Sequence, residues 1–460
     1  MSKKNGPKPA KTLQSEAIWP IRRVGIGELN GNPGKSTKMI RATPQWRPHP
    51  PLQLRLLNAA GRTVQRLGFG RPTLDEASLI EAAHEATGLE DFGPDRFRSG
   101  LRTLIESLEH ESRLSPLGRA AARREFVGHL ANRLRVLEHR KRHPEVAAEE
   151  IRGPLFVIGM ARTGTTLLFG LLAQDPAHRS PLTWEVSSPC PPPETATYDS
   201  DPRIEEAERR FEAMKRAIPG FEAIHPVGAR LPQECLLIHA MDFHSVLFEA
   251  TYNVPSYQRW LELQDMRPTY RFQRDFLQHL QSRCPGERWV LKSPAHLMAL
   301  DALLEVYPDA IIVQTHRDPL EVIGSAASLH CTLRSASSDG SDPHAVGRDQ
   351  LELWSRLLDR AIAVRDRSAD QASRFFDVQY EDLLSDPLGC VRRIYSHFRM
   401  NLTDEAEARM CNFMVENGRE KHGVHRYTLE MFGIDAAEAF DRFAGYCRRF
   451  EVKRRTGFGG

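Results

Sequence analysis

One short segment limits the fold of this chain more than any other. It reads Phe156-Val-Ile-Gly-Met-Ala-Arg-Thr-Gly-Thr-Thr-Leu-Leu168, a short apolar run, a glycine-rich turn and a second apolar run. Gly159 and Gly164 have the spacing of a P-loop, in which backbone N–H groups and the following helix N-terminus hold an anion. The segment therefore predicts a buried strand that enters a helix through an anion-binding turn.

Further short apolar segments predict more strands of the same sheet. They begin at Arg288, Ala310 and Arg374, and helical patterns separate them. These predicted helices cover residues 164–173, 203–218, 256–283, 296–306, 320–330 and 346–369. Short apolar strands that alternate with helices indicate a parallel sheet covered on both faces. We therefore expect an α/β fold, with a parallel β-sheet flanked by helices.

The residues before this sheet show a different pattern. Residues 52–143 have helical periodicity. Within them, Thr73-Leu-Asp-Glu76 has the form of a capping box for a helix that ends at Gly88, and Ser115-Pro116 predicts a second helix start. The sequence thus divides into an extended basic N-terminal arm at 1–50, a helical region at 51–150 and an α/β domain at 151–460.

Composition and charge narrow the class of protein. Hydrophobic residues make up 40% and charged residues 27% of the 460 residues, which is typical of globular proteins. Residues 1–50 hold ten Lys or Arg and two acids, a net charge of +8, whereas the whole chain carries +3. The arm lacks interleaved aromatic residues and a recognition helix. We therefore interpret it as a solvated or partner-packing arm and expect no specific nucleic-acid binding.

The cysteines and the hydropathy of the sequence indicate in which cellular compartment the protein is expected. The seven cysteines are scattered and form no CxxC pair, and the start of the chain has no apolar core of a secretory signal. We therefore expect reduced thiols and a cytoplasmic protein. The most apolar long stretch, Leu231–Pro255, is interrupted by Glu234, Asp242 and Glu249. The sequence thus predicts no transmembrane segment.

The glycine turn departs from a nucleotide triphosphatase in two ways. The position of the Walker lysine holds Thr165, and the cation of the turn is Arg162. No obvious acid for Mg²⁺ lies at the end of a neighbouring predicted strand. The sequence retains a phosphate cradle without the magnesium site, and no metal-ligand cluster is visible. The missing magnesium site argues against a Mg-NTP-dependent kinase or NTPase, which we keep as an alternative function because the phosphate cradle is present. A non-catalytic nucleotide-binding protein is a second alternative.

The turn resembles the 5′-phosphosulfate loop of sulfotransferases that use 3′-phosphoadenosine 5′-phosphosulfate (PAPS). Cytosolic members read PKSGTT and tyrosylprotein members PRSGTT, where this chain reads MARTGTT. The likeness extends over about 154–434 through Leu291-Lys-Ser-Pro-Ala-His296, Thr315-His-Arg-Asp-Pro319 and Val378-Gln-Tyr-Glu-Asp-Leu383. The chain therefore resembles the bacterial PAPS-dependent sulfotransferase family, which has a P-loop-like sulfotransferase fold.

The resemblance implies roles for individual residues. Arg162, which is also a catalytic cation, would hold the 5′-phosphosulfate with Thr163, Gly164, Thr165 and Thr166. Arg317 and Ser325 match the arginine and serine that bind the 3′-phosphate, and Tyr380 would line the adenine site. Lys421 and Gly423 lie in a late basic loop that corresponds to another 3′-phosphate contact. Lys292 would be the second catalytic cation.

The general base is left open between three residues. Glu185 corresponds to a glutamate that follows the loop arginine in tyrosylprotein sulfotransferases, displaced by a small insertion. His296 lies two residues beyond the histidine position of cytosolic members, which here holds Pro294. His225 is supported by its residue type alone. We favour Glu185, because His296 follows a proline and is expected to enter a helix.

The resemblance implies transfer of a sulfuryl group from PAPS to a hydroxyl of a small-molecule or glycoconjugate acceptor, with adenosine 3′,5′-bisphosphate (PAP) as product and no metal. We expect the acceptor pocket within 181–260, whose aromatic residues suit a small hydroxylated lipophile, a phenol or a glycoconjugate. These are Trp184, Phe221, Phe243, Phe248, Tyr252, Tyr257 and Trp260. Homo-oligomerisation is left open.

Overall fold

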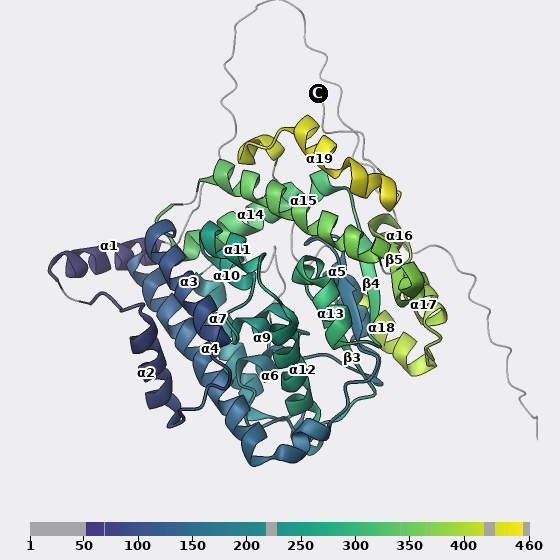
Figure 1. Ribbon diagram of the computed structural model, residues 1–460, viewed down its shortest axis with the longest axis horizontal. Coiled ribbons are helices and arrows are strands. Elements are labelled where there is room, and N and C mark those ends of the chain that lie inside the picture. The colour runs from purple at the N-terminus through teal and green to yellow at the C-terminus, as the bar shows by residue number, and fades with distance from the viewer. Residues whose placement is uncertain are drawn as a thin grey trace, which may run out of the picture. The chain divides into compact units, whose positions relative to one another are not determined.

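The fold contains a parallel sheet surrounded by helices (Figure 1). The strand order in the sheet is β2-β3-β1-β4-β5. The structure is a computed structural model that describes residues 52–68, 70–217, 228–340, 342–367, 369–417 and 428–453. The strands are β1 Leu155–Ile158, β2 His178–Arg179, β3 Arg288–Lys292, β4 Ile311–His316 and β5 Phe375–Gln379. The predicted parallel sheet is therefore confirmed. The sequence pattern missed β2, because two residues are too short for a periodicity.

The central strand β1 sends alternate side chains into two separate hydrophobic cores. It pairs with β3 on one side and with β4 on the other. Phe156 and Ile158 belong to the larger core, whereas Leu155 and Val157 belong to a second core. Because successive side chains of a strand point to opposite faces, the sheet is buried on both faces.

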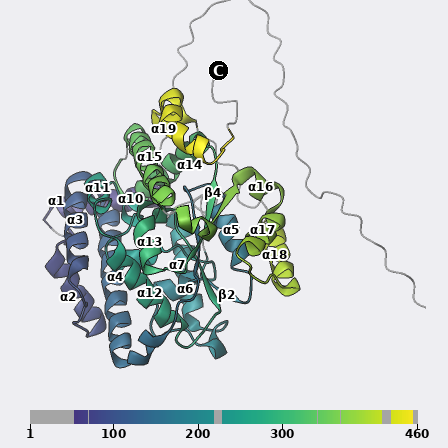
Figure 2. The ribbon, with the colours of Figure 1, turned by 45° about the vertical axis from the view of Figure 1, so that its right-hand side comes forward.

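Different helices cover the two faces (Figure 2). Helices α5 Thr165–Leu172, α17 Pro387–His397 and α18 Asp404–Glu416 pack on one face. The other face meets α12 Arg267–Gln281, α13 Leu300–Val306, α14 Pro319–Ser337, α15 Pro343–Arg367 and α19 Ala436–Arg449. The shorter helices are α6 Thr183–Ser187, α9 Leu236–Ala240, α10 Leu247–Thr251, α11 Pro255–Leu261 and α16 Tyr380–Ser385, and α7 covers Pro202–Ala217.

Two sequence-based details of the helices were wrong. The predicted helix 256–283 consists of α11 and α12, and α12 starts with a proline in its first turn, where the missing N–H is tolerated. The helix that ends at Gly88, α2 Glu76–Thr87, is capped by Asp75 rather than by Thr73. Asp75 accepts a hydrogen bond from the Ser78 N–H, which places the cap two residues later than the motif predicts.

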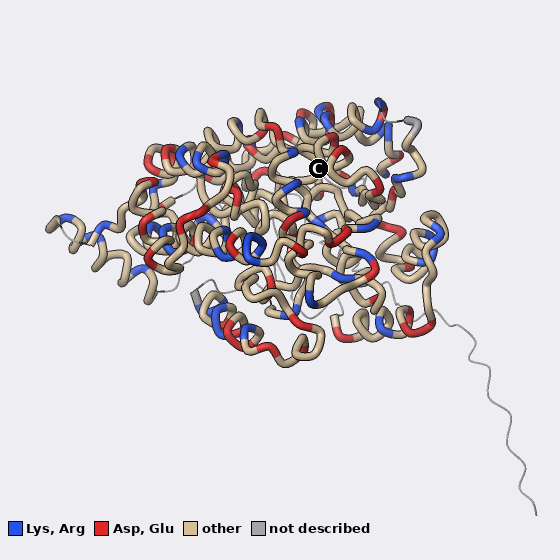
Figure 3. The backbone as a smooth tube through the Cα atoms, turned by 60° about the horizontal axis from the view of Figure 1, so that its bottom comes forward, with Lys and Arg blue, Asp and Glu red and all other residues tan. Residues whose placement is uncertain are grey.

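The helical region consists of α1 Leu52–Arg66, α2, α3 Arg96–Glu111 and α4 Pro116–Arg142. Ser115 caps α4 as predicted, and its hydroxyl accepts from the Gly118 N–H at 3.0 Å. Acidic and basic residues are interspersed along most helices, whereas the charged residues of α1 are all arginines (Figure 3). None of the described helices is long and apolar enough to cross a membrane.

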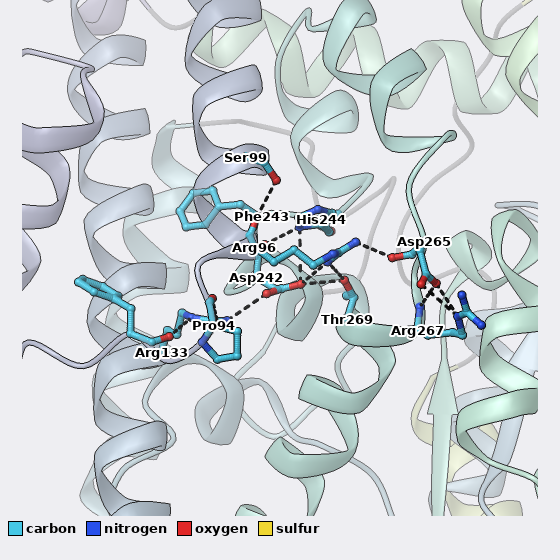
Figure 4. Close-up of polar contacts among 12 residues, drawn as sticks. Pro94, Arg96, Ser99, Arg133, Asp242, Phe243, His244, Asp265, Arg267 and Thr269 are labelled. Carbon is cyan, nitrogen blue, oxygen red and sulfur yellow. Dashed lines mark hydrogen bonds and ion pairs between the residues drawn. The ribbon is translucent and has the colours of Figure 1, made fainter.

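A buried charge cluster ties the helical region to the rest of the fold (Figure 4). Asp242 accepts hydrogen bonds from Arg96 of α3 at 2.9 Å, Arg133 of α4 at 3.1 Å and Thr269 of α12 at 2.8 Å. The Arg133 and Asp242 side chains are 3% and 6% exposed, and burial lowers the pKa of Arg133. The helical region and the sheet with its covering helices belong to one compact unit, and the domain boundary at 150 stays a prediction.

Candidate active site at the carboxyl ends of the strands

The glycine turn after β1 has three residues with positive φ. They are Gly159 at +141°, Arg162 at +68° and Gly164 at +88°. A Cβ atom on Gly159 would lie 2.5 Å from Thr315 Oγ1, and one on Gly164 would lie 2.8 Å from a Leu383 methyl carbon. Glycine is therefore required at both positions. Arg162 has no such freedom, and a non-glycine residue in this conformation is strained by about 1–2 kcal/mol, a feature that clusters at ligand sites.

The hydroxyl of Thr163 holds this turn in shape. It donates to the Met160 carbonyl at 2.7 Å and shares a hydrogen bond with Thr315 Oγ1 at 2.6 Å. The side chain is fully buried, as is most of Thr165 at the start of α5. The side chains of Arg162 and Thr166, by contrast, are exposed. The turn thus presents its backbone and two polar side chains outward, while Thr163 fixes the backbone from beneath.

The residues that follow β4 and β5 meet this turn. Arg317 donates to the Arg162 carbonyl at 2.9 Å and to Glu321 at 2.8 Å through Nε. Its guanidinium lies over the Tyr380 ring, 4.1 Å from the centroid. Arg162 Nε donates to Ser325 Oγ at 3.2 Å. The structure therefore brings together Arg162, Gly164, Arg317, Ser325 and Tyr380, which are far apart in sequence.

Lys292, the last residue of β3, lies on the other side of the turn. Its ammonium donates to Thr166 Oγ1 at 3.4 Å and forms a close ion pair with Glu234. The side chains of Lys292 and Glu234 are 3% and 13% exposed. The N–H of Cys235 donates to the Lys292 carbonyl at 3.0 Å, which holds the segment of Glu234 beside the strand end. A cation, a carboxylate and the start of α5 therefore meet at one point.

Sequence reasoning did not identify Glu234 as a site residue. It noted Glu234 as one of three acids that interrupt an apolar stretch, and each of the three is a partner in an ion pair. Asp242 binds Arg96 and Arg133, and Glu249 binds Arg334 at 2.5 Å. An acid within an apolar stretch was therefore a usable signal for a buried charge pair. It does not reveal which acid lies at the strand ends.

Glu185 lies in a closed environment. Its carboxylate is fully buried, accepts from Arg179 Nη2 at 2.5 Å and accepts from the Leu182 N–H at the start of α6 at 2.6 Å. Arg179 is itself held by the carbonyl of Leu280 at 2.7 Å and by that of Cys284. The nearby carboxylate of Glu185 raises the pKa of Arg179 against the opposing effect of burial. Both oxygens of Glu185 thus serve structural partners.

His296 lies in the larger hydrophobic core. It is fully buried in the 3-10 turn Pro294–Met298, and its Nδ1 is 2.9 Å from the Tyr270 hydroxyl. The ring meets Phe156 of β1 edge-on, with 5.1 Å between centroids. Burial keeps the pKa of His296 well below its usual value, so the ring is neutral.

Other predicted residues also lie away from the turn or outside the described part. Five aromatic residues expected around an acceptor are core residues with at most 1% exposure: Trp184, Phe243, Phe248, Tyr252 and Tyr257. Trp260 is partly buried against the same core. His225, Phe221, Lys421, Gly423 and residues 1–50 lie outside the described residues. Among the described residues, no group of three or more His, Cys, Asp or Glu side chains could hold a metal ion.

Comparisons with known proteins agree with this geometry. The sequence profile of the sulfotransferase family matches residues 154–404, which is more than half of the chain. The chain belongs to the sulfotransferase family. The matched range contains the glycine turn, the strand ends that carry Lys292 and Arg317, and Glu234. The predictions of the family, of an enzyme and of a sulfotransferase activity are thereby confirmed.

Two solved structures, each more than 30% identical to this chain, support its membership of the family. Sulfotransferase STF1 from Mycobacterium tuberculosis is 36% identical, with 82% of this chain and 99% of that chain covered and a TM-score of 0.73. Sulfotransferase STF9 from Mycobacterium avium is 33% identical, with 83% and 98% covered and a TM-score of 0.76. These likenesses cover a larger share of this chain than the family profile does.

A functionally named relative is more distant. The omega-hydroxy-beta-dihydromenaquinone-9 sulfotransferase Stf3 of Mycobacterium bovis is 28% identical over 314 residues, which cover 64% of this chain and 76% of that protein. Its name states omega-hydroxy-beta-dihydromenaquinone-9 as the molecule that it sulfates.

Proposed function

We propose that this sulfotransferase uses PAPS as its donor and transfers the sulfuryl group to a hydroxyl of a lipophilic small molecule. The observation that carries the proposal is the meeting of Lys292, Thr166 and Glu234 beside the glycine turn. When bound, PAPS supplies a sulfuryl group on a phosphate leaving group. The acceptor hydroxyl must lose a proton, and negative charge must develop on the leaving oxygen.

The glycine turn fits the 5′ end of such a donor. Gly159 and Gly164 leave no room for side chains, so backbone N–H groups of the turn and of the first residues of α5 are available to an anion. Arg162 adds a cation, and Thr166 adds an exposed hydroxyl. Thr163 and Thr165 contribute through the backbone, since their side chains are buried.

The neighbouring arginine fits the 3′ end. A guanidinium has five N–H donors in a fixed plane and binds a phosphate with two parallel hydrogen bonds. Arg317 is oriented by Glu321 and by stacking on Tyr380, so its position is set before a ligand arrives. Ser325 belongs to the same site through its hydrogen bond with Arg162. We assign Tyr380 to the adenosine side of this pocket.

Two residues are proposed for the chemical step. Lys292 stabilises the charge on the leaving oxygen, because a fixed cation in a largely buried position is worth more than one in water. Glu234 accepts the proton of the acceptor hydroxyl at a carboxylate oxygen. Glu185 and His296 keep structural roles in this proposal, because the partners of Glu185 occupy both of its oxygens and His296 is enclosed by core residues.

The acceptor class rests on the relative that is named for a hydroxylated menaquinone. The test is to incubate the protein with PAPS and a set of hydroxylated acceptors, and to follow both PAP release and the sulfated product. Long-chain alcohols and hydroxylated isoprenoid quinols should be sulfated, whereas sugars should not. Sulfation of sugars alone would contradict the acceptor assignment but retain the donor.

The donor is tested separately. PAP should bind in EDTA, as measured by calorimetry, and Lys292→Met should abolish turnover while PAP still binds. Magnesium-dependent hydrolysis of a nucleoside triphosphate, with no transfer from PAPS, would instead favour the alternative of a kinase or NTPase.

A further inference from the structure

Helix α1 combines an outward apolar face with a stripe of arginines. Its inner side packs on α4: the Leu117 N–H donates to Asn58 at 3.0 Å, and a Cβ on Gly61 would lie 2.7 Å from Pro116 Cβ. On the opposite side, Leu52 and Leu56 are one turn apart and are 66% and 61% exposed. Leu57 and Val64 widen this face and are 55% and 46% exposed.

The arginines of α1 lie along one flank of this face. Arg55, Arg62 and Arg66 are separated by seven and four residues, a spacing that places them on one stripe of a helix. The helix contains no acidic residue. Arg62 pairs with Asp339 at 3.1 Å, whereas Arg55 and Arg66 form no ion pair within the part of the chain that the structure describes. The stripe therefore carries unneutralised positive charge next to exposed leucines.

A basic pocket continues this stripe. The pocket has a volume of about 410 Å³, and its lining includes Arg62, Arg66, Arg71, Arg113 and Arg119. Glu109 is the acidic residue in the lining, and it pairs with Arg71 at 3.1 Å and with Arg119. Guanidinium groups bind phosphate oxygens with paired hydrogen bonds. The pocket thus has the charge and the donors for a phosphate group.

We propose that α1 and this pocket form a docking surface for a lipid bilayer with anionic head groups. An interfacial helix lies flat, with its apolar face in the acyl boundary and its basic residues at the head groups. A second copy that paired its α1 with this α1 would cover the leucines but would bring only more arginines, because the helix contains no acidic residue. A bilayer with anionic lipids supplies both an apolar cover and the counter-charge.

The surface is separate from the site at the strand ends, so the proposal does not depend on the donor or the acceptor. α1 contributes none of the residues around the glycine turn. If the acceptor is a membrane lipophile, docking would raise the frequency with which the enzyme meets it. If the acceptor is water-soluble, docking would still be measurable as binding to vesicles.

The experiment measures binding of the full-length protein to vesicles by flotation. One set contains phosphatidylcholine alone, and in the other phosphatidylglycerol replaces part of it. We expect the anionic vesicles to bind at least about tenfold more tightly, with a preference that falls as salt is raised. The double variant Leu52→Ser/Leu56→Ser should lose about tenfold or more in affinity for the anionic vesicles.

Controls separate the surface from general stickiness. Leu263→Ser removes a leucine that is 85% exposed outside α1 and should leave vesicle binding unchanged. Arg55→Gln/Arg66→Gln should remove most of the anionic preference, whereas Arg448→Gln on α19 should not. All of these residues are exposed, and thermal melting should be unchanged in every variant, which keeps the test free of folding effects.

Several outcomes would overturn the proposal. If the wild-type protein does not bind anionic vesicles, the proposal is wrong. If it binds neutral vesicles equally well, the attraction between the arginines and anionic head groups is contradicted. Full binding by the leucine double variant assigns the attraction to another part of the chain, such as the basic arm. A dimer in solution that the leucine variant dissociates shows that a second copy covers α1 instead.

Discussion

Two carboxylates lie in neighbouring segments but have different partners: Glu185 is fully buried, and the Glu234 side chain is 13% exposed. The segments meet at the bridge between Leu182 and Pro232. Glu185 faces Arg179, which is held by the backbone carbonyls of Leu280 and Cys284. Glu234 faces Lys292, which also contacts Thr166 at the glycine turn. In our proposal, a carboxylate's partner, rather than its residue type or spacing, separates a site residue from a structural one.

The same contrast extends to the surroundings of each residue. The strand-end region, defined by Arg162, Thr166, Lys292, Glu234 and Arg317, has side chains that are at least partly accessible or that touch accessible groups. The closed polar region, which contains Glu185, Asp242, His239, His244 and His296, has polar groups that are buried against core residues. Substitutions in the first region should change chemistry, and substitutions in the second should change stability.

The largest expected effect is on turnover. Glu234→Gln should lower kcat by about 10²–10⁴-fold, the range typical of losing a general base, because the amide cannot accept the acceptor proton. PAP affinity should stay near that of the wild type, and the melting temperature should fall less than in Glu185→Gln, because the Glu234 side chain is 13% exposed and water can reach the pair with Lys292. Steady-state kinetics and calorimetry measure the two quantities. Turnover within a few-fold of the wild type would show that Glu234 is not the general base. Its partner would then no longer distinguish it in function from Glu185.

The next largest effect is on stability. Glu185→Gln should lower the free energy of unfolding by about 3–5 kcal/mol, because it leaves the buried charge of Arg179 without its partner. Molecules that remain folded should keep turnover within a few-fold of the wild type. Denaturant unfolding and kinetics below the melting temperature measure these effects. A stable Glu185→Gln protein without activity would instead make Glu185 the base.

The sequence predicts the elements better than it predicts the base. The strands β1, β3, β4 and β5 and the turn after β1 follow from local patterns, because a buried parallel strand is apolar along its length and a tight anion turn requires glycine. Arg317 and Ser325 are assigned through the family resemblance, and the structure places them directly after β4 and on α14, which are consecutive. Their approach to Arg162 follows once β1 and β4 are taken as neighbours.

The choice between Glu185 and Glu234 is not local. It depends on how the segments 181–185 and 229–234 lie beside each other and on which of them reaches the end of β3. The Gln233 N–H donates to the Pro181 carbonyl at 2.8 Å, and the Cys235 N–H donates to the Lys292 carbonyl at 3.0 Å. The residues in the first contact are 52 positions apart in the sequence, and those in the second are 57 positions apart. No periodicity or spacing in a single sequence encodes them.

Acid should act on the closed polar region. Burial lowers the pKa of His239 and of His244 to about 4. Because their pKa values in the unfolded chain are near 6.5, their neutral forms favour the folded state above that pH, and this contribution is lost as the pH falls from 6.5 towards 4. Each ring should cost roughly 1.4 kcal/mol of stability per pH unit in this window.

Denaturant unfolding between pH 7.5 and 5 measures how the free energy of unfolding changes with pH. His239→Gln should reduce this slope by about 1.4 kcal/mol per pH unit, which corresponds to one proton fewer taken up on unfolding. The control is a substitution in the strand-end region, Thr166→Ala, which should leave the slope unchanged. A flat stability profile between pH 6.5 and 5 would mean that these rings accept protons without unfolding, and that the region is less closed than its burial indicates.

The smallest effect separates two ways in which the strand-end region binds its ligand. Ser325→Ala removes the acceptor of the 3.2 Å hydrogen bond from Arg162 Nε. A single hydrogen bond to a charged group is worth about 1.5–3 kcal/mol at most, and the exposed position of Arg162 places this one at the lower end. Calorimetry should therefore show a loss of PAP affinity of roughly tenfold, with melting temperature unchanged. If Ser325 only orients Arg162, the loss should be the same for adenosine 5′-phosphosulfate, which lacks the 3′-phosphate. If Ser325 contacts the 3′-phosphate itself, that analogue should lose little affinity, so equal losses would contradict its assignment to the 3′ end.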